Sequence, residues 1–332
     1  MQTVQIYGDG ISARCAAQLL SSHGVAVSSR VELVKPRVPA IMIGAGTQQL
    51  FHDVFGRPDL FQGMPKIERR IVRWGKTDDS KVIPHSALTV SEEVLLARLK
   101  SWPGDAAEFD WSIHSERSPA STEHSFGERT AEISKVATDA SVTSTCIVES
   151  LEEGWLFLLA DSPQSAWLIS CANPTDQALR VSTVIAPYIQ AQLRAPRAFK
   201  AHPRISTPLT DERDLLCGGG ALGFDPLCGD GSGYALREGI LASAVIRAAG
   251  RDGDAAALLT HYEQRLIAGF ERHLHMCLQV YSQGGDSSWW RKQLSDTEQG
   301  IVWCRTQLTQ YPPFRYALNG FDLVEARQLH NV

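Results

Sequence analysis

Residues 3–13 read TVQIYGDGISA, and this stretch decides the fold. The run Thr3–Tyr7 is apolar enough for a buried strand, and a helix with one apolar face follows from Ile11. Between them lies a GxGxxA pattern, in which Gly8 permits a tight turn and Gly10 lets the backbone approach a pyrophosphate. Ala13 lets the helix pack closely on the strand. Because a helix N-terminus attracts anions, the pattern predicts a nucleotide-binding βαβ opening.

The acidic residue that usually grips a nucleotide ribose is displaced in this chain. Counting from Gly8, it would stand at the end of the second strand, where the chain has Val31 with Glu32 beside it. We therefore expect Glu32 to bind the ribose after a shift of one residue, or the adenosine to be held loosely.

A second glycine-rich stretch lies far along the chain. Residues 225–233 read DPLCGDGSG and precede a predicted helix from Tyr234 to Ala249. Such a loop again presents free backbone N–H groups at a helix N-terminus, which favours negative charge. The predicted contacts to a cofactor come from Asp225, Pro226, Gly229, Gly231 and Ser232.

Composition excludes several classes of partner. The chain has 332 residues, enough for about two domains, and a net charge of -5 gives no electrostatic reason for binding nucleic acid or an anionic membrane. No apolar stretch approaches the length that spans a bilayer, and the start lacks the features of a signal peptide. Seven scattered cysteines without a CxxC pair argue against a disulfide framework or a zinc site and favour a reducing cytoplasm.

Other segments give weaker predictions. Ser91 and Asp254 are expected to cap helices, the second reaching about Gln283, and residues 181–193 are predicted to be helical. His273 and His275 are two residues apart on a predicted helix and do not share a face, so we expect a solvated helix and no metal site.

These motifs together resemble the FAD-dependent aromatic monooxygenases and tryptophan halogenases. In that superfamily the second signature is a Gly-Asp pair, a proline and a Gly-x-Gly that opens a helix. Here Gly219 stands where the acid is usual. Residues 43–47 (IGAGT) look like the segment after the second strand, and Lys66 precedes Trp74 at the spacing of a halogenase lysine. The halogenase Gly-Trp-x-Trp-x-Ile-Pro motif is degenerate, because Phe157 replaces the second tryptophan and Ala160 the proline.

One branch of the superfamily is most similar. Its members modify a tryptophan in a partner protein and help to mature tryptophylquinone cofactors, such as cysteine tryptophylquinone, of bacterial amine dehydrogenases and amino-acid oxidases. The similar stretches are IERRIVRWG (67–75), PHSALTVSEEVLLARL (84–99), ESLEEGWLFL (149–158) and residues 225–248. About 80 residues follow the helix that ends near Ala249, fewer than in halogenases of free tryptophan. A less enclosed site suits a protein-borne substrate.

The resemblance implies an α/β fold with a Rossmann-like FAD-binding domain of the p-hydroxybenzoate hydroxylase type. We expect this domain to be discontinuous, formed by residues 1–75 and 205–250. A mixed-sheet substrate domain would occupy residues 76–204, and a helical segment residues 251–332.

The expected function is FAD-dependent hydroxylation of a tryptophan in a precursor polypeptide, with Lys66 and His85 as candidate catalytic residues. Two alternatives stay open: a flavin-dependent halogenase that uses Lys66, and a chaperone-like protein that keeps the fold but binds flavin weakly or not at all. No separate NAD(P)H motif is visible, so the flavin reductant also stays open.

Overall fold

The computed structural model describes residues 2–32, 35–76, 79–116, 120–172, 174–228, 230–251 and 253–326. Its first unit is a five-stranded sheet whose central strand is the one predicted at the N-terminus. The first strand pairs in parallel with strands on both sides, and α1 (Ile11–Ser22) connects it to the next one. The strand order is β15 (Thr210–Asp211), β16 (Asp214–Leu216), β6 (Trp111–His114), β1 (Thr3–Tyr7) and β2 (Ala26–Arg30).

Three long helices complete this half of the molecule: α6 (Gly231–Ala249), α7 (Ala255–Tyr281) and α8 (Ser288–Leu308). Helix α6 packs tightly against α1, because a Cβ atom at Gly239 would lie 2.5 Å from the backbone oxygen of Ser12. Burial of apolar side chains from these helices and the sheet supplies the largest core, which contains Val4, Ile6, Leu241 and Phe270.

The second unit is a nine-stranded mixed sheet. Strands β4 and β9 pair in parallel, and the other pairings of this sheet are antiparallel. The order is β12 (Ile189–Gln192), β8 (Thr130–Thr138), β11 (Ser165–Ser170), β10 (Gly154–Ser162), β9 (Thr145–Leu151), β4 (Lys66–Arg73), β5 (Lys81–Val90) and β3 (Ile41–Gly44), and β13 (Arg197–Lys200) also pairs with β8.

Shorter elements link the two units. The helices are α2 (Ala45–Phe55), α3 (Glu92–Arg98), α4 (Thr175–Val181) and α5 (Gly218–Ala221), with 3₁₀ turns at Ala140–Val142 and Ala186–Tyr188. A small sheet holds β17 (Leu222–Gly223), β14 (Arg204–Thr207) and β7 (Thr122–Ser125), and a hairpin of β18 (Tyr316–Asn319) and β19 (Asp322–Glu325) ends the described chain.

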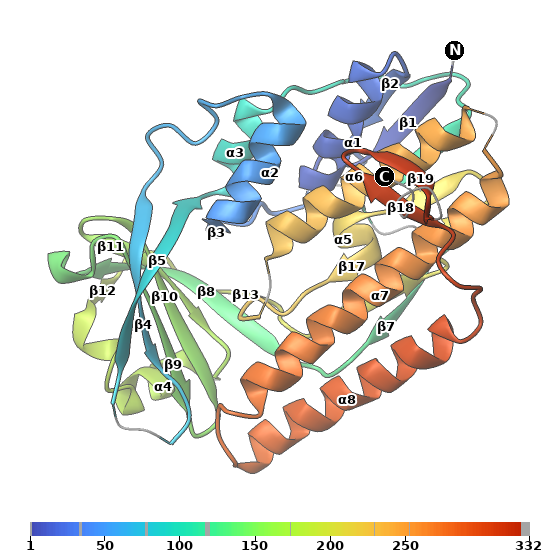
Figure 1. Cartoon of the computed structure of the whole chain (residues 1–332). Helices are drawn as coiled ribbons and strands as arrows, with labels where there is room; N and C mark the ends of the chain where they lie inside the picture. The colour runs from blue at the N-terminus through green and yellow to red at the C-terminus, as the bar shows by residue number, and fades with distance from the viewer. Residues whose placement is uncertain are drawn as a thin grey trace.

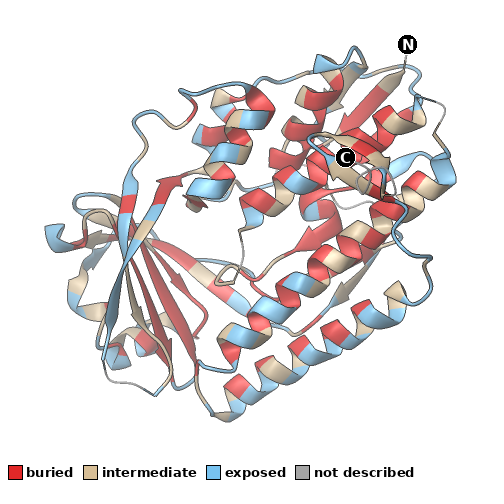
Figure 2. Cartoon of the chain, in the orientation of Figure 1, coloured by how far each residue is buried: buried red, intermediate tan, exposed pale blue. Residues whose placement is uncertain are grey.

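Figure 1 shows the large sheet on one side and the five-stranded sheet with α1, α2 and α6 on the other. The antiparallel pair α7 and α8 runs along the lower side of the molecule and reaches both units. In Figure 2 the central strands of the large sheet are mostly buried, whereas β4 and α8 keep exposed residues. One face of the large sheet packs against α7, α8 and the loop before α6, through Tyr281, Trp290 and Leu227.

Most of the predicted elements are confirmed. The strand at 3–7 and the helix at 11–22 have the predicted bounds. The hydroxyl of Ser91 accepts from the Val94 N–H, and the carboxylate of Asp254 accepts from the Ala257 N–H, so both predicted caps are present. The helix predicted over 181–193 is wrong, because Pro187 cannot continue a helix and residues 189–192 pair with β8 instead.

The predicted division into domains stays a prediction. Strand β6 lies inside the range proposed for the substrate domain but belongs to the five-stranded sheet. Strands β3 and β4 lie inside the range proposed for the FAD domain but belong to the large sheet. The seven cysteines are free thiols. Within the described residues, no helix combines the length and the apolar character needed to cross a membrane.

Candidate functional site

The first glycine motif uses its two glycines for different reasons. Gly8 has a φ of +106°, and a Cβ atom there would lie 2.2 Å from the hydroxyl oxygen of Ser115. The fold itself therefore requires Gly8. Gly10 is the N-cap of α1 with a φ of -76°, and no atom lies within 4 Å of the Cβ position. Ala13 is buried against the sheet, as the motif predicts.

Two arginines stand beside this turn, and the sequence analysis did not identify them. The carboxylate of Asp9 binds Arg14 and Arg37, each at 2.6 Å. Both guanidinium groups are therefore held next to the N-terminus of α1. An acid between the two glycines and a basic residue in the next helical turn are the sequence signal for this arrangement.

The N-termini of α2 and α6 meet at the second motif. The hydroxyl of Thr47 in α2 donates to the carboxylate of Asp230, the N-cap of α6. The same carboxylate accepts from the backbone N–H of Gly233 at 3.0 Å. Asp230 thus ties together two helix N-termini that start far apart in the sequence. Gly229, predicted to contact the cofactor, lies outside the described residues.

Five glycines are required neither by their backbone conformation nor by close packing within the described part of the protein. Each has an ordinary negative or extended φ, and no atom lies within 4 Å of the Cβ position. Every other described glycine has either a positive φ or an atom within 4 Å of the Cβ position. Four of the five lie at the first turn of α1, α2 or α6, and the other lies in the short helix α5: Gly10, Gly44, Gly46, Gly231 and Gly219. Such a lining of bare backbone fits a ligand that approaches closely, as FAD requires.

The remaining predicted cofactor contacts are placed as follows. Glu32 is exposed two residues after β2 ends, with a carboxylate oxygen 3.9 Å from the Arg30 guanidinium. Ser232 is buried in the first turn of α6, and Pro226 is half-buried in the loop before it.

Asp225 has an unexpected environment. Its carboxylate is fully buried and accepts from Arg129 and from the Tyr281 hydroxyl, both at 2.8 Å. Its backbone N–H donates to the ring nitrogen Nε2 of His273 at 2.9 Å, and the Trp155 indole N–H donates to the Tyr281 oxygen at 2.9 Å. The carboxylate thus anchors the second glycine loop to the large sheet and α7.

This anchor corrects the expectation of a solvated helix for His273. The His273 side chain is fully buried. Its ring accepts a hydrogen bond from the Asp225 N–H of the second glycine loop and lies 3.4 Å from the Cys277 sulfur. Only His275, two residues on, is exposed. Helical periodicity does not predict this burial, since the partner Asp225 is distant in sequence. No group of metal-ligating side chains is present among the residues that the structure describes.

Glu238 is a buried acid behind the short helix α5. One carboxylate oxygen accepts from the Gly218 N–H at 2.6 Å, and the other has no hydrogen-bond partner in the described part of the chain. Burial raises the pKa of Glu238 to about 8, against a lowering effect of the Gly218 N–H. The carboxyl group therefore stays protonated at neutral pH.

This gives a pH prediction. Between pH 4.5 and 8 the folded state keeps the Glu238 proton that the unfolded state has lost, so stability falls as the pH rises, by about 1.4 kcal/mol per pH unit from this group. Glu238→Gln should remove that slope. Relative to the wild type, the variant should therefore be more stable at pH 7.5 than it is at pH 5.5. Urea unfolding at both pH values measures it. Equal pH dependence in both proteins would reject a protonated Glu238.

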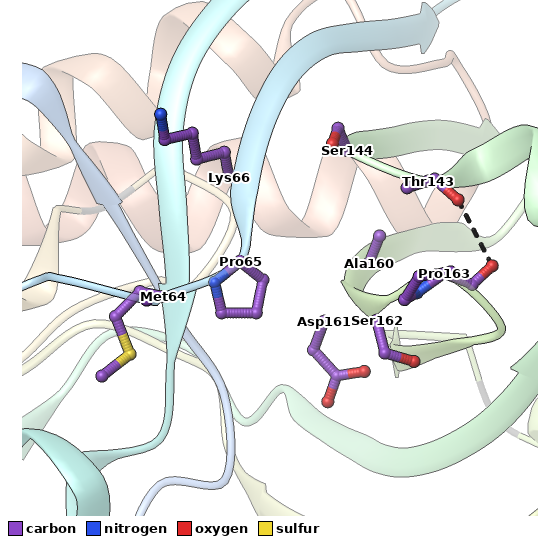
Figure 3. Close-up of a pocket in the computed structure, with 10 residues that line it drawn as sticks. Met64, Pro65, Lys66, Thr143, Ser144, Ala160, Asp161, Ser162 and Pro163 are labelled. Atoms are coloured by element: carbon purple, nitrogen blue, oxygen red, sulfur yellow. Dashed lines mark hydrogen bonds between the residues drawn. The ribbon is translucent and has the colours of Figure 1, made fainter.

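The two candidate catalytic residues lie on neighbouring strands. Lys66 begins β4 and is exposed, in one cross-strand row with Leu88 and Ile43, which pack in the cluster of α2 and α6. It also borders a surface hollow of about 270 Å³ with Asp161 and Ser162, but Figure 3 shows its ammonium group pointing away from those two residues. None of the glycine-motif residues lines this hollow.

His85 lies in the middle of β5, half-buried, and its Nε2 atom has no partner among the described residues. Burial, and then the nearby charge of Arg70, lower the pKa of His85. The imidazole is therefore neutral at neutral pH and can accept a proton. Nothing in the geometry places His85 and the Lys66 ammonium group against each other.

The comparisons define the class of fold. The chain has the fold of FAD-dependent monooxygenases and halogenases, as the resemblance predicted. It is similar to the peptidyl tryptophan dihydroxylase QhpG, essential for tryptophylquinone cofactor biogenesis. That alignment has a TM-score of 0.73 at 15% identity and covers 97% of this chain and 86% of QhpG.

Two further solved structures support the same class. The flavin-dependent halogenase CmlS aligns with a TM-score of 0.71 at 16% identity, over 93% of this chain and 72% of CmlS. HpxO of Klebsiella pneumoniae, in complex with FAD and uric acid, aligns with a TM-score of 0.63 at 15% identity, over 94% of this chain and 97% of HpxO. Neither a family model nor a curated protein sequence matches the chain.

Proposed function

We propose that this protein is an FAD-dependent monooxygenase that hydroxylates a tryptophan in a partner polypeptide. The observation that carries the proposal is the set of five glycines that neither backbone conformation nor packing requires. They lie at the N-termini of α1, α2 and α6 and in α5. Helix N-termini attract the phosphates of a cofactor, and HpxO, which has this fold, was solved in complex with FAD. The likeness to a peptidyl tryptophan dihydroxylase supports the kind of substrate.

The residues for holding FAD divide along its length. The bare backbone at Gly10, with Arg14 and Arg37 beside it, suits the diphosphate, and Glu32 suits the ribose of the adenosine. The N-termini of α2 and α6, including Gly46 and Gly231, suit the ring end of the flavin. Their backbone N–H groups would stabilise negative charge there.

When bound and reduced, FAD supplies with O2 the oxygen atom that enters the indole, and the second oxygen leaves as water. The chain's own residues position the reaction. The buried face of the large sheet excludes water, and the Asp225 anchor fixes the loop before α6. The unpaired Nε2 atom of His85 can accept the proton that the hydroxylated ring carbon releases.

Halogenation is the second candidate, because Lys66 shares a cross-strand row with residues that pack against α2. Against it, Phe157 replaces the second tryptophan of the halogenase motif and is buried among apolar side chains. A protein that keeps the fold but has lost flavin binding is the third candidate, since Gly219 replaces the usual acid.

The test supplies the protein with reduced FAD, O2, chloride and bromide, in separate assays with free tryptophan and with an unmodified precursor of a tryptophylquinone enzyme. We expect the precursor to gain the mass of oxygen and free tryptophan to react poorly, because remote contacts are needed to position the ring. Lys66→Ala should keep part of the activity. Mass spectrometry and a flavin titration provide the readouts.

Each alternative has a distinct result. A chlorinated or brominated product that disappears in Lys66→Ala would establish the halogenase. Stable binding of the precursor with no flavin binding at high FAD concentration would establish the chaperone-like protein. Efficient oxidation of free tryptophan, with no complex with any polypeptide, would reject the protein substrate.

A further inference from the structure

A row of side chains crosses the large sheet on the face turned toward α7. Strand register places one residue from each of six strands in this row, and two of them, Cys146 and Leu159, belong to a buried cluster with Tyr281 of α7. Residues in register on neighbouring strands project from the same face. The row is Ile83, Arg70, Cys146, Leu159, Trp167 and Lys135.

Arg70 differs from three other cations at this sheet, each of which has an acidic partner. Lys135 pairs with Asp161, and Arg73 lies 3.4 Å from Glu149. At the end of β8, Arg129 lies 2.8 Å from Asp225. The guanidinium group of Arg70 makes no ion pair and no hydrogen bond with the residues that the structure describes. The sheet therefore supplies an acid to each of these cations except Arg70.

The unpaired atom of Arg70 is protected from water. Its Nε atom is buried without a hydrogen-bond partner, as is Nε2 of the nearby His85. Leaving a buried N–H of a charged group without a hydrogen bond costs free energy. A ligand that accepts a hydrogen bond from this N–H would remove that cost. Because His85 is neutral, Arg70 carries the positive charge of this pair.

The same face lies opposite the second glycine loop. Leu227 and Cys228 of that loop pack against the cluster that contains Cys146 and Leu159. A group bound to Arg70 would therefore lie on the sheet face against which this loop packs. A guanidinium edge with a free Nε–H and a free terminal N–H matches the two oxygens of a carboxylate.

We infer that Arg70, with His85 beside it, binds an acidic side chain of the substrate polypeptide next to the target tryptophan. This inference rests on the proposed function and specifies its substrate: a tryptophan flanked by aspartate or glutamate. Arg70 is then a specificity residue, because it orients the polypeptide without acting on the indole ring.

The test measures binding of two peptides by calorimetry in the presence of saturating FAD: an acetylated, amidated Glu-Trp-Glu and its Gln-Trp-Gln counterpart. These peptides have no terminal charges, so only the side-chain carboxylates differ. We expect the acidic peptide to bind about tenfold more tightly at low salt. Arg70→Gln should abolish the preference, and Arg70→Lys should keep part of it because charge remains without the planar fork.

Arg69→Gln is the matched control. It removes the same charge from the preceding residue of β4. The Arg69 guanidinium donates to the Thr145 hydroxyl at 2.7 Å, and the cross-strand neighbours of Arg69 lie outside the row. The preference should survive in Arg69→Gln. FAD affinity should be unchanged in the Arg70 variants, because Arg70 is assigned to the polypeptide and not to the cofactor.

The outcomes separate this inference from the proposed function. Equal affinities for the two peptides in the wild type, including no binding of either, would overturn it. So would an equal loss in Arg69→Gln, or a loss of FAD affinity in Arg70→Gln. A preference that depends on Arg70 without oxidation of any tryptophan would keep the carboxylate site and reject the oxygenation. Oxidation of the tryptophan without a preference for the acidic peptide would keep the oxygenation and reject the carboxylate site.

Discussion

Gly10→Val is expected to abolish FAD binding and to leave the fold intact. The Cβ position of Gly10 meets no atom within 4 Å, and the backbone has a φ that valine adopts readily. The new side chain would instead occupy the space that a diphosphate needs at the N-terminus of α1. We expect the affinity for FAD to fall by at least about 100-fold, or about 2.8 kcal/mol, in a fluorescence titration.

Gly8→Ala provides the contrast at the neighbouring glycine. Gly8 has a φ of +106°, and the new Cβ atom would lie 2.2 Å from the Ser115 hydroxyl oxygen. Both features predict a loss of stability whether or not FAD is present. The thermal midpoint without FAD should therefore fall in Gly8→Ala and stay unchanged in Gly10→Val. Unchanged FAD affinity in a folded Gly10→Val protein would exclude α1 from the cofactor site.

Asp225→Ala should be the most destabilising single change in the site. It removes the counter-ion of the buried Arg129 guanidinium and the acceptor of the Tyr281 hydroxyl. Breaking a buried ion pair from one side costs about 3–5 kcal/mol, since the remaining charge cannot be solvated. Urea unfolding measures the loss, and the freed loop before α6 should also weaken FAD binding.

Asp286→Ala is the matched control, because the Asp286 carboxylate pairs at 2.6 Å with Lys76 in an exposed position. Exposed ion pairs contribute little, so the free energy of unfolding should not change measurably. A double variant Asp225→Ala with Arg129→Met should recover part of the stability, because both charges are then absent. A small effect of Asp225→Ala alone would contradict the assigned network.

Local features of the sequence were enough to predict the elements that carry the glycine motifs. The βα opening follows from an apolar run, a Gly-x-Gly turn and a helical period within residues 3–22, and the caps at Ser91 and Asp254 follow from side chains that bind their own helices. Each of these signals acts between residues that are close in sequence. The resemblance to flavin enzymes then predicted the fold class, which the comparisons confirm.

The tertiary structure decided what depends on distant partners. Residues 189–192 form a strand because β8 offers them backbone hydrogen bonds, which no local pattern reveals. Asp225 points into the protein because Arg129 and Tyr281 are brought to it, and Gly10 differs from Gly8 in its φ and in what surrounds the Cβ position. Arg70 is conspicuous only when Arg73 and Lys135 of the same sheet are seen to have acidic partners and its own guanidinium has none. Burial and pairing arise from contacts between segments far apart in the chain, so the sequence specifies them only through the folded state.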